Sequence, residues 1–229
     1  MTSPVYDVIY HTYDPSKINN ILECGASYYN QLQTHSALKL KKNVWYIEPT
    51  EGSYLDLKNR GLKNVINAAL TTYDGEIDFT VATNLPCNSS ISHSDKHEQE
   101  LKDRNIKMFQ TKVPCYTYET ILEKTNCIFD LLILDVEGHE KSIIESFKKI
   151  ERDKLPKIIS IECGYYWKNL KPVLLELDYV IDYYYFNNCY VRLKSFEIEK
   201  DETMIKKLNE ANKKFVFNNH LVYENELSL

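Results

Sequence analysis

Residues 128–140, IFDLLILDVEGHE, decide the fold that the sequence predicts. Six apolar or aromatic residues are interrupted only by Asp130, and the run then changes abruptly to acidic residues, glycine and histidine. A short apolar run between polar residues is typical of a strand buried on both faces of a parallel sheet. Residues 141–150 follow with apolar side chains at helical spacing. The segment therefore indicates a strand–turn–helix unit, with Asp135 at the tip of the strand.

The acidic residues after this strand have two interpretations. Open α/β sheets bind ligands at the carboxyl ends of their strands, so Asp135 could be an active-site carboxylate. Alternatively, the turn only joins a strand to a helix, and Glu140 favours the positive N-terminal end of that helix. The local sequence leaves both alternatives open.

Strand and helix patterns alternate on both sides of this unit. Strands are predicted at 18–26, 43–49, 64–70, 71–82, 106–115, 157–164, 179–186 and 189–194, and helices at 29–42, 51–60, 117–124, 167–178 and 202–214. A further short strand is predicted within residues 5–10, VYDVIY. Short connections between these elements favour a mostly parallel sheet with right-handed crossovers.

Charge and composition restrict the class of protein. The net charge is −5 and the basic residues are dispersed, which argues against nucleic acid as a partner. No stretch reaches the roughly 18 apolar residues that a membrane span needs, and the N-terminus does not resemble a secretory signal. The six cysteines lie far apart without a C-x-x-C pair. We therefore expect reduced cysteines in a cytoplasmic protein, without a zinc site or a disulfide frame.

Several motifs then carry a resemblance to a known family. They are ILECGA (21–26), YIEP (46–49), NAAL (67–70) followed by DGEIDF (74–79), NSSI (88–91), VPCYTYETIL (113–122) and LLILDVEGHE (131–140). In this order the chain resembles the FkbM family of class I S-adenosylmethionine-dependent methyltransferases. The resemblance implies a Rossmann-like seven-stranded sheet with helices on both faces. It also implies binding of S-adenosylmethionine (AdoMet) and methyl transfer, usually to a hydroxyl oxygen of a sugar or another small metabolite.

The resemblance assigns the cofactor to the first three strands. Glu23 would face the ammonium of the amino acid tail, and the turn at Gly25 and Ala26 would let backbone N–H groups approach that tail. Glu48 would accept hydrogen bonds from the ribose hydroxyls, as acidic residues do in dinucleotide-binding folds. Ala69 would belong to the adenine slot.

The reacting groups are assigned to the strand tips that follow. Asp135 would lie beside both the sulfonium of the cofactor and the acceptor. Its carboxylate, helped by Glu137 or His139, would remove the acceptor's proton. A carboxylate there could also ligate a divalent cation, although the sequence supplies no persuasive metal site. Glu162 and Tyr165 are predicted to contact the substrate.

We interpret residues 1–229 as a single domain. Residues 1–17 would form an N-terminal cover, 18–165 the cofactor-binding core, and 166–229 the C-terminal strands and helices. Residues 83–112 could form a lid that closes over the substrate.

The first motif leaves other functions open. The family's first loop usually reads D-x-G-A-N-x-G, and Glu23, Ser27 and Tyr29 depart from it. If Tyr29 filled the cofactor pocket, the chain would be a non-catalytic binding or scaffold protein on the same fold. An RNA ribose methyltransferase is a second alternative, and it requires a basic groove beside Asp135. His93 and His97 have metal-ligand spacing, but a solvated loop explains them better.

Overall fold

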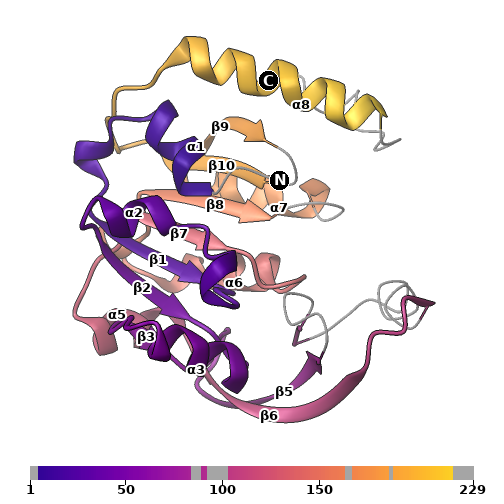
Figure 1. Ribbon diagram of the computed structural model, residues 1–229. Coiled ribbons are helices and arrows are strands. Elements are labelled where there is room, and N and C mark those ends of the chain that lie inside the picture. Colours follow the sequence, from indigo (N-terminus) through magenta and orange to yellow (C-terminus); the bar gives the residue numbers. More distant parts are fainter. Residues whose placement is uncertain (1–4, 84–88, 92–102, 163–166, 186–187, 219–229) are drawn as a thin grey trace.

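A seven-stranded sheet forms the centre of the molecule (Figure 1). The computed structural model describes residues 5–83, 89–91, 103–162, 167–185 and 188–218. The strands, in spatial order, are β3 (Val65–Ile66), β2 (Asn43–Ile47), β1 (Asn20–Cys24), β7 (Leu131–Leu134), β8 (Ile158–Glu162), β10 (Asn188–Leu193) and β9 (Tyr179–Tyr185). β10 is antiparallel to both of its neighbours, whereas the other pairings are parallel. The mostly parallel sheet that the sequence predicts is therefore confirmed.

The order of the strands creates a crevice at one edge of the sheet. β1 lies between β2 and β7 and is parallel to both. From β1 the chain builds outward through β2 and β3, and it later returns to build β7 and β8 on the other side. Connections from β1 and β7 therefore leave towards opposite faces, and a crevice forms beyond their carboxyl ends. This topology predicts a ligand site beyond Cys24 and Leu134.

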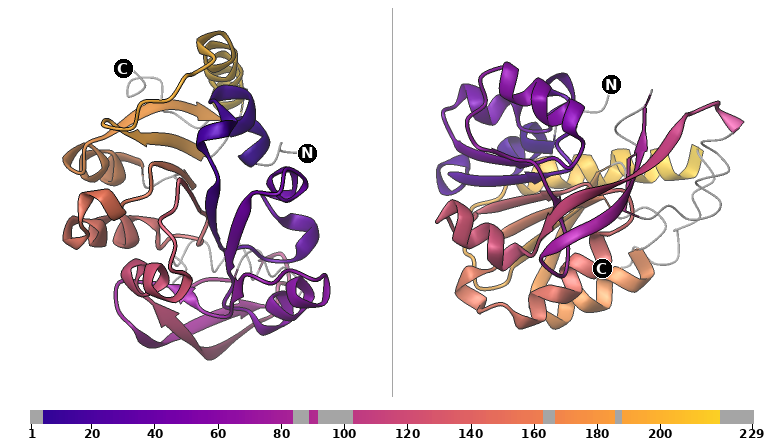
Figure 2. Two further views of the ribbon diagram at one scale, coloured as in Figure 1. Left: turned by 90° about the vertical axis from the view of Figure 1, so that its left-hand side faces the viewer. Right: turned by 90° about the horizontal axis from the view of Figure 1, so that it is seen from below.

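Helices cover both faces of this sheet, as the left view of Figure 2 shows. One face packs against α1 (Val5–Thr12), α2 (His35–Lys39), α3 (Glu51–Asn59) and α8 (Glu202–Asn218). The other face packs against α5 (Tyr118–Thr125), α6 (Glu140–Ser146) and α7 (Trp167–Glu176). Short 3-10 turns lie at Pro15–Lys17, Tyr29–Gln31, Phe147–Lys149 and Arg152–Lys154. Along β7, Leu131 and Ile133 pack on the first face while Leu132 and Leu134 pack on the second.

A second, three-stranded sheet lies beside the first. It has the order β4 (Ala69–Leu70), β6 (Met108–Tyr116), β5 (Gly75–Ala82). The single strand predicted at 64–70 is wrong, because β3 and β4 belong to different sheets. The break lies at Asn67, whose side-chain NH₂ donates to the backbone oxygens of Glu48 and Pro49 at 2.8 and 3.1 Å.

Two further predicted elements differ from the structure. Residues 5–10 belong to helix α1, not to a strand, because their buried side chains recur at helical spacing. The helix predicted at 29–42 is interrupted between the turn at Tyr29–Gln31 and α2. The backbone of Gln33 and the hydroxyl of Thr34 bond to a buried carboxylate within this interruption.

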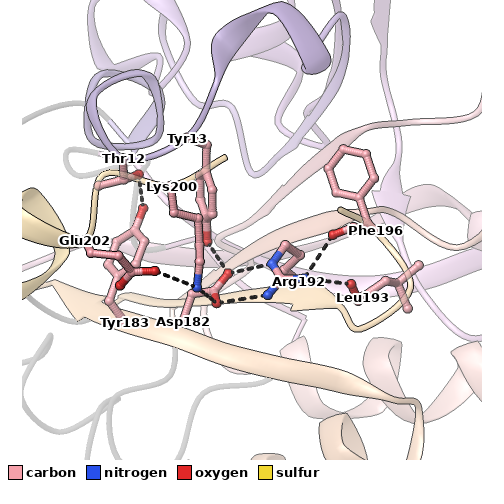
Figure 3. Close-up of polar contacts among 9 residues, drawn as sticks. All are labelled: Thr12, Tyr13, Asp182, Tyr183, Arg192, Leu193, Phe196, Lys200 and Glu202. Atoms are coloured by element: carbon pink, nitrogen blue, oxygen red, sulfur yellow. Dashed lines mark hydrogen bonds and ion pairs between the residues drawn. The ribbon is translucent and has the colours of Figure 1, made fainter. Parts of the chain in front are cut away.

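A buried ion network ties the N-terminal segment to the last strands of the sheet (Figure 3). The side chain of Asp182 on β9 is 4% exposed and accepts a hydrogen bond from Tyr13 Oη at 2.8 Å. It also pairs with Arg192 Nε and Lys200 Nζ, each at 3.0 Å. Tyr13 and Lys200 are further joined by an antiparallel backbone bridge. The network therefore holds the chain after α1 against β9 and β10.

Asp182→Asn is expected to lower the free energy of unfolding by about 2 kcal/mol. The amide removes the negative charge while Arg192 and Lys200 remain partly buried. Unfolding in urea measures the loss. The control Asp78→Asn breaks the pair with Lys112, whose side chains are 78% and 63% exposed, and is expected to change little. Equal small losses in both variants would contradict a special role for the network.

Two smaller observations complete the fold. Among the helices that the structure describes, none is long and apolar enough to cross a membrane. Among the described cysteines, Cys24, Cys115 and Cys127 are free thiols, and Cys87 and Cys163 lie outside the described residues.

Candidate active site

The carboxyl ends of β1, β2 and β7 border a cavity of about 460 Å³. This volume lies in the range of pockets that hold small organic ligands. Residues 30–33 and His35, residues of β4 and β5, and the short segment 89–91 complete its wall. Six of the predicted site residues line it, namely Gly25, Ala26, Glu48, Ala69, Asp135 and Glu137.

Gly25 allows the end of β1 to touch the end of β7. Its φ is +79°, and a Cβ atom at this position would lie 1.7 Å from the carbonyl oxygen of Asp135. The N–H groups of Gly25 and Ala26 both donate to the carbonyl oxygen of Ile47, at 3.1 and 3.3 Å. These donors thus close the edge between β1 and β2, and their predicted contact with a cofactor tail stays a prediction.

Glu23 lies beneath the cavity wall and is 1% exposed. Its carboxylate accepts hydrogen bonds from Gln33 N at 2.8 Å and Thr34 Oγ1 at 2.5 Å. Burial raises the pKa of Glu23 to about 7, although these hydrogen bonds oppose the shift. The Glu23 carboxylate therefore holds Gln33 and Thr34 in position, and Gln33 lines the cavity. Direct contact of Glu23 with an ammonium stays a prediction.

Glu48 and Ala69 lie at the cavity as the resemblance implies. Glu48 is 4% exposed, and its two oxygens accept the N–H groups of Ser27 and Thr50, each at 2.7 Å. Burial raises the pKa of this carboxyl. Each carboxylate oxygen has a second lone pair, so Glu48 could still accept a ribose hydroxyl. Ala69 and Phe79 supply an apolar part of the wall.

The Tyr29 side chain packs against His35, which lines the cavity, and against Arg60, which does not. Its ring lies edge-on to His35, with centroids 4.8 Å apart, and the Arg60 guanidinium carbon lies 5.7 Å from its centroid. Its backbone N–H donates to Asp56 Oδ2 at 2.9 Å. Tyr29 is not among the residues that line this cavity, so the alternative in which its ring fills the pocket is not what the structure shows.

Three carboxylates gather where Asp135 and Glu137 line the cavity. One oxygen each from Asp135, Glu137 and Glu162 lies within 4.8 Å of the other two. Burial raises the pKa of Asp135 well above its usual range, and the charges of Glu162 and Glu137 raise it further. Burial, with the charges of Glu162 and Glu140, raises the pKa of Glu137 to about 8. Asp135 and Glu137 can therefore retain protons at neutral pH, and the spacing of the three carboxyl groups could also accommodate a divalent cation.

Glu140 shapes the turn that carries Glu137. Its buried carboxylate accepts hydrogen bonds from Val136 N at 2.9 Å and Gly138 N at 3.0 Å. Glu137 itself has a left-handed φ of +54°, which is unusual for a residue with a side chain. Glu140 therefore fixes this conformation, beyond the helix-end role that the sequence suggested.

His139 occupies the position before α6. Its Nε2 atom is buried and has no hydrogen-bond partner in the part of the chain that the structure describes. Burial lowers the pKa of its imidazole, so the neutral form is favoured. His139 is not among the residues that line the cavity, and its help to Asp135 stays a prediction.

The segment 89–91, which the sequence analysis gave only as part of the NSSI motif and of the predicted lid, contributes residues to the cavity. Ser90 is buried, and its Oγ donates to the carbonyl oxygen of Glu137 at 2.7 Å. The backbone of Ser90 pairs with Thr80 on β5, while Ser89 and Ile91 line the cavity. The NSSI motif was the one signal for these residues in the sequence. A motif does not identify the partners of its residues, so the contacts with Glu137 and Thr80 could not be predicted.

The predicted lid is only partly described. Residues 108–112 belong to β6 and pair with β5, and closure of this segment over a substrate stays a prediction. Residues 89–91 adjoin the cavity, and residues 84–88 and 92–102 lie outside the described residues.

Three residues that the sequence singled out, Tyr165, His93 and His97, cannot be placed. All of them lie outside the described residues, so the substrate contact of Tyr165 and the histidine spacing stay predictions.

Comparison with known proteins gives one positive result. A search of curated proteins finds no match to the chain. A family model, the methyltransferase FkbM domain, matches residues 18–213. This match begins just before β1 and extends into α8, so it covers the whole seven-stranded sheet and the cavity. The chain therefore belongs to the FkbM-domain methyltransferase family.

Proposed function

We propose that this methyltransferase uses AdoMet and methylates a hydroxyl oxygen of a small metabolite of the sugar class. The observation that carries the proposal is the cavity at the crevice of the sheet. Glu48 and the apolar wall at Ala69 line it together with the carboxylates of Asp135 and Glu137. When bound, AdoMet supplies an electrophilic methyl group, and the chain has to orient the acceptor and manage its proton.

The cavity suits the chemistry of this cofactor. Its volume of about 460 Å³ fits a ligand that contains a nucleoside and an amino acid. Glu48 offers carboxylate oxygens to ribose hydroxyls, and Ala69, Leu70 and Phe79 offer apolar surface to an adenine ring. The carboxyl oxygens of Asp135 and Glu137 carry partial negative charge, which would favour a positively charged sulfonium nearby.

Glu137 is the better candidate for the general base. A base works best when its pKa lies near the working pH, and burial and neighbouring charges raise the pKa of Glu137 to about 8. Asp135, whose pKa is raised well above its usual range, would retain its proton and donate a hydrogen bond. Glu162 would stabilise this division of roles through its contact with Asp135.

The test is calorimetric titration with AdoMet, followed by transfer of a labelled methyl group to a panel of sugars and glycosides. We expect saturable binding by the wild type and at least about tenfold weaker binding by Glu48→Ala. Glu48 also accepts hydrogen bonds from Ser27 and Thr50, so Glu48→Ala changes the structure of the site as well as the contact with the ribose. Binding of adenosine and of 2′-deoxyadenosine to the wild type is therefore compared, because these ligands differ only in a ribose hydroxyl. If the wild type did not bind AdoMet, the proposal would be overturned.

Tyr29→Leu is expected to leave the affinity for AdoMet within about twofold of the wild type. The substitution removes the contacts of the ring with His35 and Arg60, but Tyr29 itself is not among the residues that line the cavity. The same calorimetric titration measures it. A gain of tenfold or more would mean that the Tyr29 ring obstructs the cofactor.

No observation favours the two other functions that the sequence left open. A scaffold protein would need a closed cavity, and Tyr29 does not line the one found. An RNA methyltransferase would need a basic groove, and the described residues that line the cavity include neither lysine nor arginine.

A further inference from the structure

Gln33 connects the wall of the cavity with Glu23 and with the start of helix α1. It lies in the interruption between the turn at Tyr29–Gln31 and α2, and it lines the cavity. Its backbone N–H donates to Glu23 Oε1 at 2.8 Å. Its carbonyl oxygen accepts Tyr6 N at 3.1 Å, and its side-chain Oε1 accepts Val5 N at 3.2 Å.

These partners fix the orientation of the Gln33 side chain. A backbone N–H can only donate, so the amide atom that faces Val5 must be the oxygen. Val5 and Tyr6 lie in the first turn of α1, where N–H groups have no partner within the helix. Gln33 thus caps α1 with two of its oxygens. Its NH₂ group is the one polar group of this residue that these contacts leave unused.

The cavity needs such a donor for the proposed cofactor. AdoMet carries one anionic group, the carboxylate of its amino acid tail, and the cavity is lined by Glu48, Asp135 and Glu137. The backbone donors at the end of β1 are already used, since Gly25 and Ala26 donate to Ile47. The N–H of Ser27 is likewise used, because it donates to Glu48 at 2.7 Å.

Resting on the proposed function, we propose that the side-chain NH₂ of Gln33 binds the carboxylate of the cofactor's amino acid tail. Glu23 is then a positioning residue, because its buried carboxylate holds the Gln33 backbone from behind the cavity wall. Helix α1 also contributes to the site, because Val5 and Tyr6 hold the Gln33 amide in an orientation that leaves the Gln33 NH₂ group free for the ligand.

Gln33→Glu removes the proposed contact with the ligand and keeps the cap on helix α1. The new side chain keeps an oxygen for Val5 N, and negative charge near a helix N-terminus is favourable, so α1 stays capped. The NH₂ donor is replaced by a carboxylate oxygen, which repels the tail. We expect an unchanged melting temperature and at least about tenfold weaker AdoMet binding in calorimetry.

Two ligand analogues identify the group that Gln33 contacts. Decarboxylated AdoMet lacks only the carboxylate, and 5′-methylthioadenosine lacks the whole tail. In the wild type, decarboxylated AdoMet should bind at least about tenfold more weakly than AdoMet. In Gln33→Glu the order should reverse, and 5′-methylthioadenosine should bind both proteins equally.

A matched control and the contrary outcomes complete the test. Gln31→Glu places the same charge on the cavity lining, where Ser27 Oγ donates to Gln31 Oε1 at 2.6 Å, and so measures the effect of charge alone. Gln33→Glu should weaken AdoMet binding at least about threefold more than Gln31→Glu does. Equal losses in both variants, or equal losses for AdoMet and 5′-methylthioadenosine, would overturn the contact with the tail while the proposed function stands. Failure of the wild type to bind AdoMet would overturn both.

Discussion

Gly25→Ala is expected to lower the free energy of unfolding by about 3 to 5 kcal/mol. The added Cβ would lie 1.7 Å from the carbonyl oxygen of Asp135, and the atom it meets belongs to backbone. A flexible side chain could move aside, but this carbonyl belongs to the end of β7, whose strand is paired on both sides. The ends of β1 and β7 must therefore separate. The positive φ of +79° adds its own strain once a side chain is present.

Gly61→Ala is the matched control for this substitution. Gly61 has a similar φ of +85°, but a Cβ added there would have no described atom within 4 Å beyond its chain neighbours. Alanine at this position should cost only the backbone strain, about 1 kcal/mol. Urea unfolding of both variants isolates the steric part as the difference between them. Equal losses would mean that the contact with Asp135 relaxes freely, which would contradict a rigid junction between the two strands.

The same substitution should also damage the ligand site. Gly25 and Asp135 both line the cavity, so separation of the two strand ends displaces the wall on both sides of the cofactor. Where Gly25→Ala remains folded at low temperature, AdoMet binding should fall by at least about tenfold. Calorimetry in the cold on the folded fraction measures this loss, and Gly61→Ala should bind like the wild type.

Local sequence predicts the parts of this fold that depend on local physics. The apolar run before Asp135 is β7, because its alternate side chains fill both faces of the sheet. Thr117 caps α5, with its Oγ1 accepting the N–H of Thr120 at 3.2 Å. Both features involve residues within a few positions of one another, where periodicity and side-chain chemistry suffice.

The remaining features depend on residues far apart in the chain. Nothing near 64–70 indicates two sheets, because the partner of Ala69 is Cys115, far along the sequence. The carboxylates at the strand tips were predicted as a set, but their partners were not. Gln33 illustrates the difficulty, since its role follows from contacts with Val5, Tyr6 and Glu23 that only the packing of α1 brings together.

Glu23→Gln is expected to raise the free energy of unfolding by about 3 kcal/mol at pH 8 and to change it little near pH 4. Burial raises the pKa of Glu23 from 4.5 to about 7. Stability from the neutral carboxyl is therefore fully present below pH 4.5 and is lost as pH rises through about 7. Glutamine cannot ionise, so it keeps that stability at every pH.

The neighbours of Glu23 make glutamine an acceptable replacement. Gln33 N needs an acceptor, which the amide oxygen supplies, while Thr34 Oγ1 can accept from the amide NH₂. Thr34 can then direct its own proton towards Tyr46 Oη, 3.1 Å away. Glu48 differs, because each of its two oxygens accepts a backbone N–H group, so an amide NH₂ in either place would face a donor. Glu48→Gln should therefore destabilise the protein at every pH.

Urea unfolding of Glu23→Gln, Glu48→Gln and the wild type between pH 4 and pH 9 tests this contrast. The gain from Glu23→Gln should appear between pH 4.5 and about 7 and stay constant above that range. AdoMet binding at pH 8 separates the two possible roles of Glu23. If the carboxylate only positions Gln33, the variant binds AdoMet as the wild type does, because both hydrogen bonds survive. If its charge meets the ammonium of the tail, affinity falls at least about tenfold although the protein has become more stable.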